Sequence, residues 1–179
     1  DATMEDVKNF FFKHYGPQNA TLVIGGNVEF DNVKTLVTKW YAEIPAREKY
    51  IRTIAPEPKQ EETRRLVIER KVPTDAIYMS FRMGNRLTHD HYLGDIVSDI
   101  LSAGKSSRLY QSLVKEKKLF TDASAYILGG IEDGIFLFSG HLMEGIDFAT
   151  AEQSILIEIE LLIEKSISAN ELTKIKNKF

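Results

Sequence analysis

The sequence predicts an α+β fold in which helices pack on one side of a mixed, largely antiparallel sheet. Expected strands come in adjacent pairs between helices, without the strict strand–helix alternation of a doubly wound fold. The 179 residues are 43% hydrophobic and 27% charged, which is ordinary for a chain that buries a core. We therefore expect residues 1–179 to form a single module.

Composition excludes several classes of function. The net charge of −3 provides no basic surface for nucleic acid. The absence of cysteine excludes disulfides, thiolate zinc sites and a cysteine nucleophile. No apolar run approaches the roughly 20 residues that span a bilayer, and no address signal indicates a compartment. Because the chain begins with Asp1 and finishes in a helical pattern, we expect a piece of a longer multi-module protein.

The first expected element is a helix that begins after Thr3. Thr3 can cap it together with Asp6, although Asp is shorter than the usual Glu of a capping box. One face carries the side chains of Val7, Phe10, Phe11 and His14. The helix ends near Gly16-Pro17, and the β-rich run NATLVIGG at 19–26 follows.

A second helix is expected from Asp31, which can cap it, to Tyr41. Residues 46–63 then form an exposed connector, because they are charged, contain two prolines and lack periodicity. Beyond it, RRLVIERK at 64–71 and AIYMSFRMG at 76–84 are expected to be strands, the second with strict alternation.

Two helices separated by a tight turn should follow. From Asp90 to Gly104, apolar residues recur at helical spacing, and the glycine is placed to end the helix. The next helix runs from Ser106 or Ser107 to about Lys117. These apolar residues are Leu93, Ile96, Val97, Ile100 and Leu101.

The remaining elements are a strand pair and two helices. FTDASAYILG at 120–129 and GIFLFSGHL at 134–142 flank the turn residues GIEDG, which indicates an antiparallel pair. A long helix is expected over 148–164, and another begins at 169. The face of the long helix expected to be buried comprises Ala151, Ile155, Ile159, Leu162 and Ile163.

The letters Gly104-Lys105-Ser106 suggest a phosphate-binding loop, but the pattern fails. The first glycine of such a loop would stand at position 99, which is Asp99. The preceding segment is moreover an amphipathic helix, whereas the loop needs a strand. A glycine stop followed by a serine cap explains these residues.

Other candidate chemistry is weak. His89-Asp90-His91 is the one close histidine pair, but residues two apart point to different helix faces and further ligands are missing. His14 and His141 are more typical of structural positions. Asp122 and Asp133 are more simply explained as solvated residues at strand ends and turns than as an acid–base pair. The aromatic residues Phe10, Phe11, Phe12, Phe136 and Phe138 are expected in the core, with exposure of one aromatic of each set at an interface left open.

Four stretches together resemble the pitrilysin/insulinase family of zinc metallopeptidases, which includes the mitochondrial processing peptidases. The strongest is ILSAGKSSRLYQSLVKEKKLFTDASAY, in which a helix ends in glycine, an S-S-R-L-Y run opens the next helix, and a basic stretch leads into a strand. The others, in family order, are MEDVKNFFFKHYGPQNATLVIGGNV, VTKWYAEIP and EIELLIEKSISANELTKIKNKF. The likeness covers nearly the whole chain.

This resemblance implies a mixed α/β sandwich module, four of which close like a clamshell around unfolded peptide. The family's zinc site lies in the first module of a half, in an inverted H-x-x-E-H with a later glutamate. This chain contains no H-x-x-E-H. We therefore expect the second, non-catalytic module of a half, with no catalytic residue and no metal ligand of its own, from a parent protein that is a zinc endopeptidase.

The resemblance also bears on which half is present. The substrate-clamping half of the family supplies an arginine and, seven residues later, a tyrosine that stabilise the oxyanion. Here those positions hold Lys115 and Asp122, or Val114 and Thr121 in the alternative register, so the zinc-bearing half is favoured. Lys115 is a candidate substrate contact, although a solvated lysine is the simpler interpretation.

The structural motif of the family is expected at Ser106, Ser107, Arg108, Leu109 and Tyr110. The implied partners are the zinc-bearing module, the opposite half of the same protein or a sister subunit, and a peptide substrate. Two alternatives stay open: a module of a catalytically inactive family member that acts in assembly or peptide binding, and an unrelated α+β binding domain.

Overall fold

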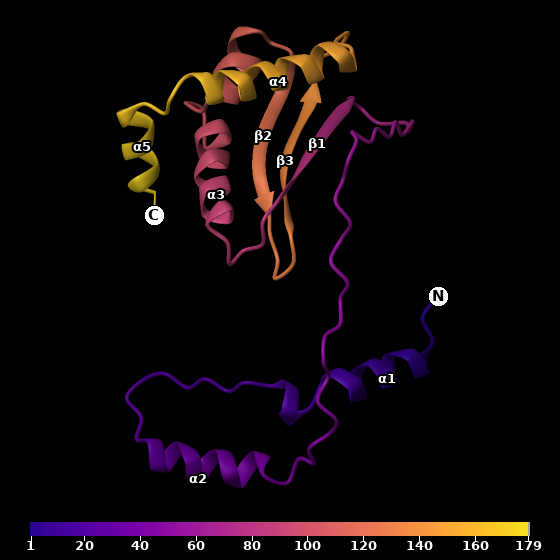
Figure 1. The fold of residues 1–179 in the computed structure, drawn as a ribbon, viewed down its shortest axis with the longest axis vertical. Helices are drawn as coiled ribbons and strands as arrows, with labels where there is room; N and C mark the ends of the chain where they lie inside the picture. The colour runs from indigo at the N-terminus through magenta and orange to yellow at the C-terminus, as the bar shows by residue number, and fades with distance from the viewer. Residues whose placement is uncertain (179) are drawn as a thin grey trace. The chain divides into compact units, whose positions relative to one another are not determined.

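The computed structural model describes residues 1–178 and divides the chain into two compact units, residues 1–59 and residues from 60 onward (Figure 1). The boundary falls inside the predicted connector 46–63, which is extended and almost fully exposed. We call these the N-terminal unit and the C-terminal unit. That both belong to one module stays a prediction.

The N-terminal unit consists of α1 (Met4–His14), the short 3-10 helix η1 (Pro17–Asn19) and α2 (Phe30–Tyr41). The capping box at Thr3 is confirmed, since its hydroxyl accepts from the amide of Asp6 and its own amide donates to the Asp6 carboxylate. The predicted cap at Asp31 is wrong. The capping position lies two residues earlier, at Glu29, so that helix α2 begins at Phe30 and Asp31 lies in its first turn.

No residue of the N-terminal unit is buried. The predicted core positions of Phe10, Phe11 and Phe12 are therefore wrong for this unit, because 58%, 50% and 55% of these residues is exposed. Polar contacts hold its turns instead. The Arg47 guanidinium donates to the carbonyls of Phe12 and Tyr15, both at 3.1 Å.

Two predicted strands, 19–26 and 64–71, form no ladder within the described residues. Each run contains three consecutive aliphatic residues, at 22–24 and 66–68, as strands often do, and apart from Asn19 at the end of η1 neither run is part of a helix or strand. A strand, however, is defined by hydrogen bonds to a neighbouring strand, and here neither run has one. Within residues 1–178, the prediction that these runs are paired strands is therefore wrong.

The C-terminal unit contains a three-stranded antiparallel sheet in the order β1-β3-β2. Its elements are β1 (Ala76–Met83), α3 (His89–Ser102), the π-helix η2 (Tyr110–Glu116), β2 (Phe120–Leu128), β3 (Gly134–Leu142), α4 (Phe148–Glu164) and α5 (Ala169–Lys176). The predicted hairpin and terminal helices are confirmed. Among residues 1–178, every helix is either too short or too polar to span a bilayer.

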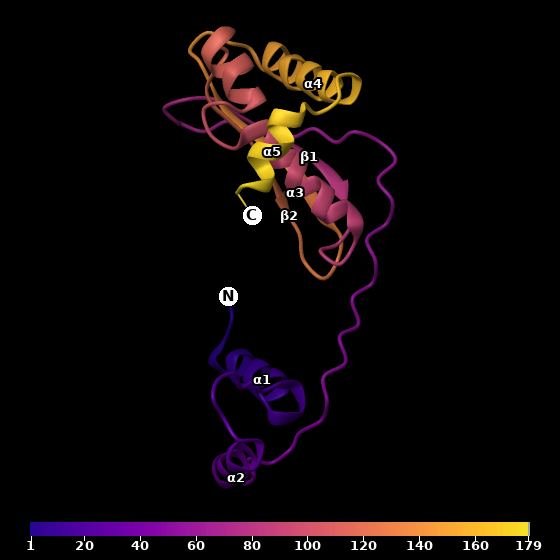
Figure 2. The same cartoon turned by 90° about the vertical axis from the view of Figure 1, so that its left-hand side faces the viewer.

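One face of the sheet forms the core. Met79 of β1, Phe138 of β3 and Ala125 of β2 stand in register, and the last two are almost fully buried. Helices supply the other side of the core through Leu101, Leu109, Leu113, Ala151 and Ile155. In Figures 1 and 2, α3 lies alongside β2 and α4 crosses the end of the sheet where β3 ends. The predicted α+β class, with helices packed on a largely antiparallel sheet, is confirmed.

Two helices differ from expectation in detail. Helix α3 begins at His89 behind Thr88, so Asp90 lies inside the first turn instead of capping it. In α4, Ile163 was expected on the buried face, but it is 78% exposed. Its neighbour Leu162 in the same last turn packs against the core, and residue 163 lies about 100° further round the helix, away from that face.

Candidate functional site

The family-like S-S-R-L-Y run lies in a tight connection between two helices, which we call the α3–η2 junction (residues 103–109). Helix α3 ends at Ser102, and Gly104 reverses the chain with a φ of 77°, a left-handed conformation that favours glycine. The amide of Ser107 then donates to the Gly104 carbonyl at 3.1 Å. The predicted helix-to-helix turn is confirmed.

Arg108 ties the junction to α5. Its Nε and Nη2 donate to the two carboxylate oxygens of Glu171, at 2.7 and 3.0 Å. This bidentate hydrogen bonding is the main cause that lowers the pKa of Glu171 to about 2, and bonds from Ser168 also contribute. The same interaction raises the pKa of Arg108. The pair is therefore fully charged at neutral pH.

The neighbouring residues of the junction also make structural contacts. Lys174 of α5 donates to the carbonyl of Ala103 at 3.1 Å and to the hydroxyl of Ser106 at 2.6 Å. Leu109 is 1% exposed within the core, and Ser107 is buried with its hydroxyl unpaired among the described residues. These contacts connect α3, η2 and α5, and the role of the run 106–110 as the structural motif of the family stays a prediction.

Helix η2 carries a buried polar cluster opposite α4. Glu158 of α4 is 5% exposed, and its Oε1 accepts hydrogen bonds from the hydroxyl of Ser112 and, at 3.1 Å, from the ammonium group of Lys117. A buried carboxylate is costly unless it is paired. Here the cation and the hydroxyl compensate the charge and fix α4 against η2.

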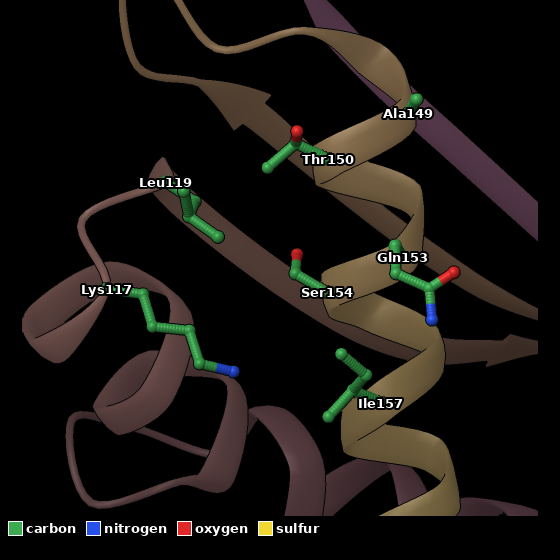
Figure 3. A pocket seen from close by; sticks show the side chains of 7 residues that line it. All are labelled: Lys117, Leu119, Ala149, Thr150, Gln153, Ser154 and Ile157. Carbon is green, nitrogen blue, oxygen red and sulfur yellow. The ribbon is translucent and has the colours of Figure 1, made fainter.

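An open hollow of about 540 Å³ lies beside this cluster, between α4 and the segment that joins η2 to β2 (Figure 3). Its lining residues are Lys117, Leu119, Ala149, Thr150, Gln153, Ser154 and Ile157. Lys117, its one charged lining residue, already binds Glu158. The hollow is largely apolar, and its lining offers no acid–base pair.

The candidate substrate contact, Lys115, projects from η2 into solvent. Its ammonium group donates to the side-chain oxygen of Gln111, one helical turn earlier, at 3.3 Å. Asp122, seven residues further on, accepts from His141 of the neighbouring strand at 2.8 Å. A role for Lys115 in substrate binding stays a prediction, and Asp122 lies at the exposed strand position expected of a solvated carboxylate.

The described residues do not fit a catalytic zinc. Across residues 1–178, no group of three histidine, aspartate or glutamate side chains lies close enough to hold a metal ion. Of the two neighbouring histidines at the start of α3, His91 turns its ring against Gly129, where an added Cβ would lie 2.5 Å from its Cε1. Its Nδ1 is buried without a partner among these residues.

Sequence reasoning missed three residues of this region, namely Glu158, Glu171 and Lys174. The sequence does contain a pattern that points to Glu171, because Ser168 and Glu171 have the spacing of a capping box and form one at the start of α5. That signal predicts a helix start, but it says nothing of Arg108, which lies 63 residues away in sequence. The partner is decided by the packing of α5.

Comparison with known proteins gives a consistent result. The chain matches the family described as "Peptidase M16 inactive domain" over residues 1–179. It is 28% identical over 177 residues to the zinc protease PqqE of Helicobacter pylori, a match that covers 97% of this chain and 40% of that protein. The crystal structure of a protease from Helicobacter pylori is similar over 99% of this chain and 44% of its own, with 28% identity and a TM-score of 0.88.

Two Bordetella structures share the fold: one is described as the "Inactive Peptidase Domain of a Putative Zinc Protease" from Bordetella parapertussis, and the other as a "putative zinc protease" from Bordetella pertussis. They are 24% and 26% identical, cover 60% of this chain and 59% of their own, and have a TM-score of 0.50. The chain thus spans about two fifths of the curated relative that it matches. It belongs to the pitrilysin-type Peptidase M16 inactive-domain family, as its four sequence stretches predicted.

Proposed function

We propose that these residues are the non-catalytic, chamber-forming part of a zinc-dependent endopeptidase that cleaves peptides or unfolded segments. The catalytic zinc is held by a module outside this chain. The observation that carries the proposal is the family match over the whole chain, together with the lack of a three-ligand group in residues 1–178. A zinc protease relative that is more than twice as long supports it.

In this proposal the chain forms part of the wall of the peptide chamber and supplies no catalytic group. The bidentate Arg108–Glu171 pair, and the pair between the buried Glu158 and the exposed Lys117, stiffen the C-terminal unit, so that its surface keeps one form against neighbouring modules. Lys115 adds an exposed positive charge that can meet peptide carbonyls or a terminal carboxylate.

The test is metal analysis and peptide cleavage, performed on the 179-residue chain and on the longer protein that contains it. We expect the chain alone to hold no stoichiometric zinc and to cleave nothing that a chelator blocks, because it lacks the ligands. The longer protein should bind one zinc for each catalytic module and lose cleavage when the metal is removed.

Two results would contradict the proposal. Stoichiometric zinc in the chain alone would show that it holds a metal site. A longer protein without zinc and without cleavage would instead support a module of an inactive family member that acts in assembly or peptide binding.

A further inference from the structure

The N-terminal unit contains an apolar run whose backbone is unpaired. Residues 21–24 lie outside any helix or strand, and within residues 1–178 their amides and carbonyls make no backbone hydrogen bond. Leu22, Val23 and Ile24 are 58%, 84% and 46% exposed. Three consecutive aliphatic residues are typical of a strand covered on both faces, so this run is built for a sheet that the described residues do not supply.

The two helices that flank this run are uncovered as well. Helix α1 exposes three consecutive phenylalanines, and α2 exposes 55% of Leu36 and 67% of Trp40. Both helices are amphipathic and neither contains a buried residue. Exposed apolar surface on this scale marks an interface rather than a free surface.

The order of these elements indicates what covers them. A helix, a strand and a helix in succession form a unit that adds a strand to an existing sheet and lays its helices on one face of that sheet. The unit cannot stabilise itself, because a single strand has no ladder and 59 residues without a core do not offset the entropy of ordering them.

A solved relative indicates where that sheet lies. The protease from Helicobacter pylori has counterparts for 99% of this chain, so the helix–run–helix segment is retained there, and only 44% of that protein is matched. More than half of the relative therefore remains to provide the covering surface.

We propose that residues 4–41 complete the β-sheet of another module of the same polypeptide. The run 21–24 joins that sheet as a strand, and α1 and α2 cover one of its faces. The inference rests on the proposed function in one respect, namely that the chain is part of a longer multi-module protein. It goes beyond it by dividing the family-matched region between two modules near residue 60, in place of the single module that the sequence alone predicted.

Hydrogen exchange tests the proposal. In the 179-residue chain the amides of 21–24 should exchange at the rate of an unfolded peptide, because they lack acceptors. In the longer protein they should exchange at least about 100-fold more slowly, as strand amides do. Protection in the chain alone would overturn the proposal, and light scattering would show whether a second copy then supplies the sheet. Fast exchange in the longer protein would overturn it too.

A proline variant provides a second readout. Val23→Pro removes a ladder donor and fixes φ, which a central strand does not tolerate. We expect it to lower the unfolding midpoint of the longer protein and to leave the C-terminal unit of the 179-residue chain unchanged. Ile54→Pro is the matched control, since Ile54 is an exposed aliphatic residue of the connector, 55% exposed. Equal effects of the two variants in the longer protein would contradict the proposed strand.

The two proposals fail separately. A longer protein that lacks zinc and cleavage but protects 21–24 refutes the proposed function and keeps this inference. An active zinc protease in which 21–24 exchange freely does the reverse.

Discussion

Gly104 and Lys118 lie on either side of η2, and both have a positive φ, of 77° and 51°. Gly104 adopts this conformation without steric cost. Lys118 is placed as the left-handed residue that ends a helix, since the amide of Leu119 donates back to the carbonyl of Leu113 at 2.9 Å. A side chain with a Cβ is strained there, and Lys118 is exposed.

Lys118→Gly is therefore expected to stabilise the C-terminal unit by about 0.5–1 kcal/mol. The matched variant Gly104→Ala should destabilise it by about 1 kcal/mol, purely through its backbone, because an added Cβ meets nothing within 4 Å. Urea unfolding followed by far-UV circular dichroism measures both. A loss of stability in Lys118→Gly would mean that the lysine side chain contributes more than its backbone strain costs.

At the scale of elements, α5 depends on a charge pair. Arg108 and Glu171 are 21% and 31% exposed in their side chains, so solvent weakens the pair only in part. The carboxylate also closes the capping box of α5 with Ser168. One glutamate thus both starts the helix and anchors it to the α3–η2 junction.

The low pKa of Glu171 gives this pair a defined pH dependence. The folded pKa of about 2 lies below the ordinary value of 4.5, so the stabilisation is complete above pH 4.5 and is lost as pH falls toward 2. Glu171→Gln can keep the capping hydrogen bonds through its one oxygen, but it removes the charge and places an amide donor where an Arg108 hydrogen bond was accepted. We expect it to cost about 1–2 kcal/mol at pH 7, after allowance for solvent screening, and progressively less below pH 4.5.

Urea midpoints between pH 7 and pH 3 measure this difference. Glu160→Gln, at an exposed position of α4, is the matched control and should show a small difference that does not follow this course. A Glu171→Gln difference that stays constant with pH would mean that the ion pair contributes nothing to stability.

Strands show where prediction at this scale stops. The alternation in 76–83 and the hairpin pattern over 120–142 were sufficient to predict strands, because these runs pair with one another within the chain. The runs 21–24 and 64–71 also contain consecutive β-branched and aliphatic residues, but neither has a partner strand among residues 1–178. Pairing is a non-local property, and propensity does not report it.

At the scale of the molecule, the two units differ in kind. The C-terminal unit has a continuous core, whereas the N-terminal unit has no buried residue. Cooperative unfolding arises from a shared core, so only the C-terminal unit should show it in this chain.

The single tryptophan, Trp40, reports on the N-terminal unit alone. Because it is 67% exposed, its fluorescence in the 179-residue chain should be that of a tryptophan in water. It should not change cooperatively at the urea midpoint that circular dichroism finds for the C-terminal unit. A blue-shifted emission that moves to longer wavelength at that midpoint would contradict this, since it would place Trp40 in a core within the chain.

The sequence by itself determined the α+β class, most helices and the family, because periodicity, caps and short motifs are local. It also excluded a phosphate loop, through Asp99 and the helix before Gly104. Only the tertiary structure decided that Arg108 binds Glu171, that Glu158 is buried against Lys117, and that the phenylalanines of α1 face solvent. Each of these features depends on which parts of the chain, distant in sequence, pack against the residue. A local sequence pattern carries no information on that packing.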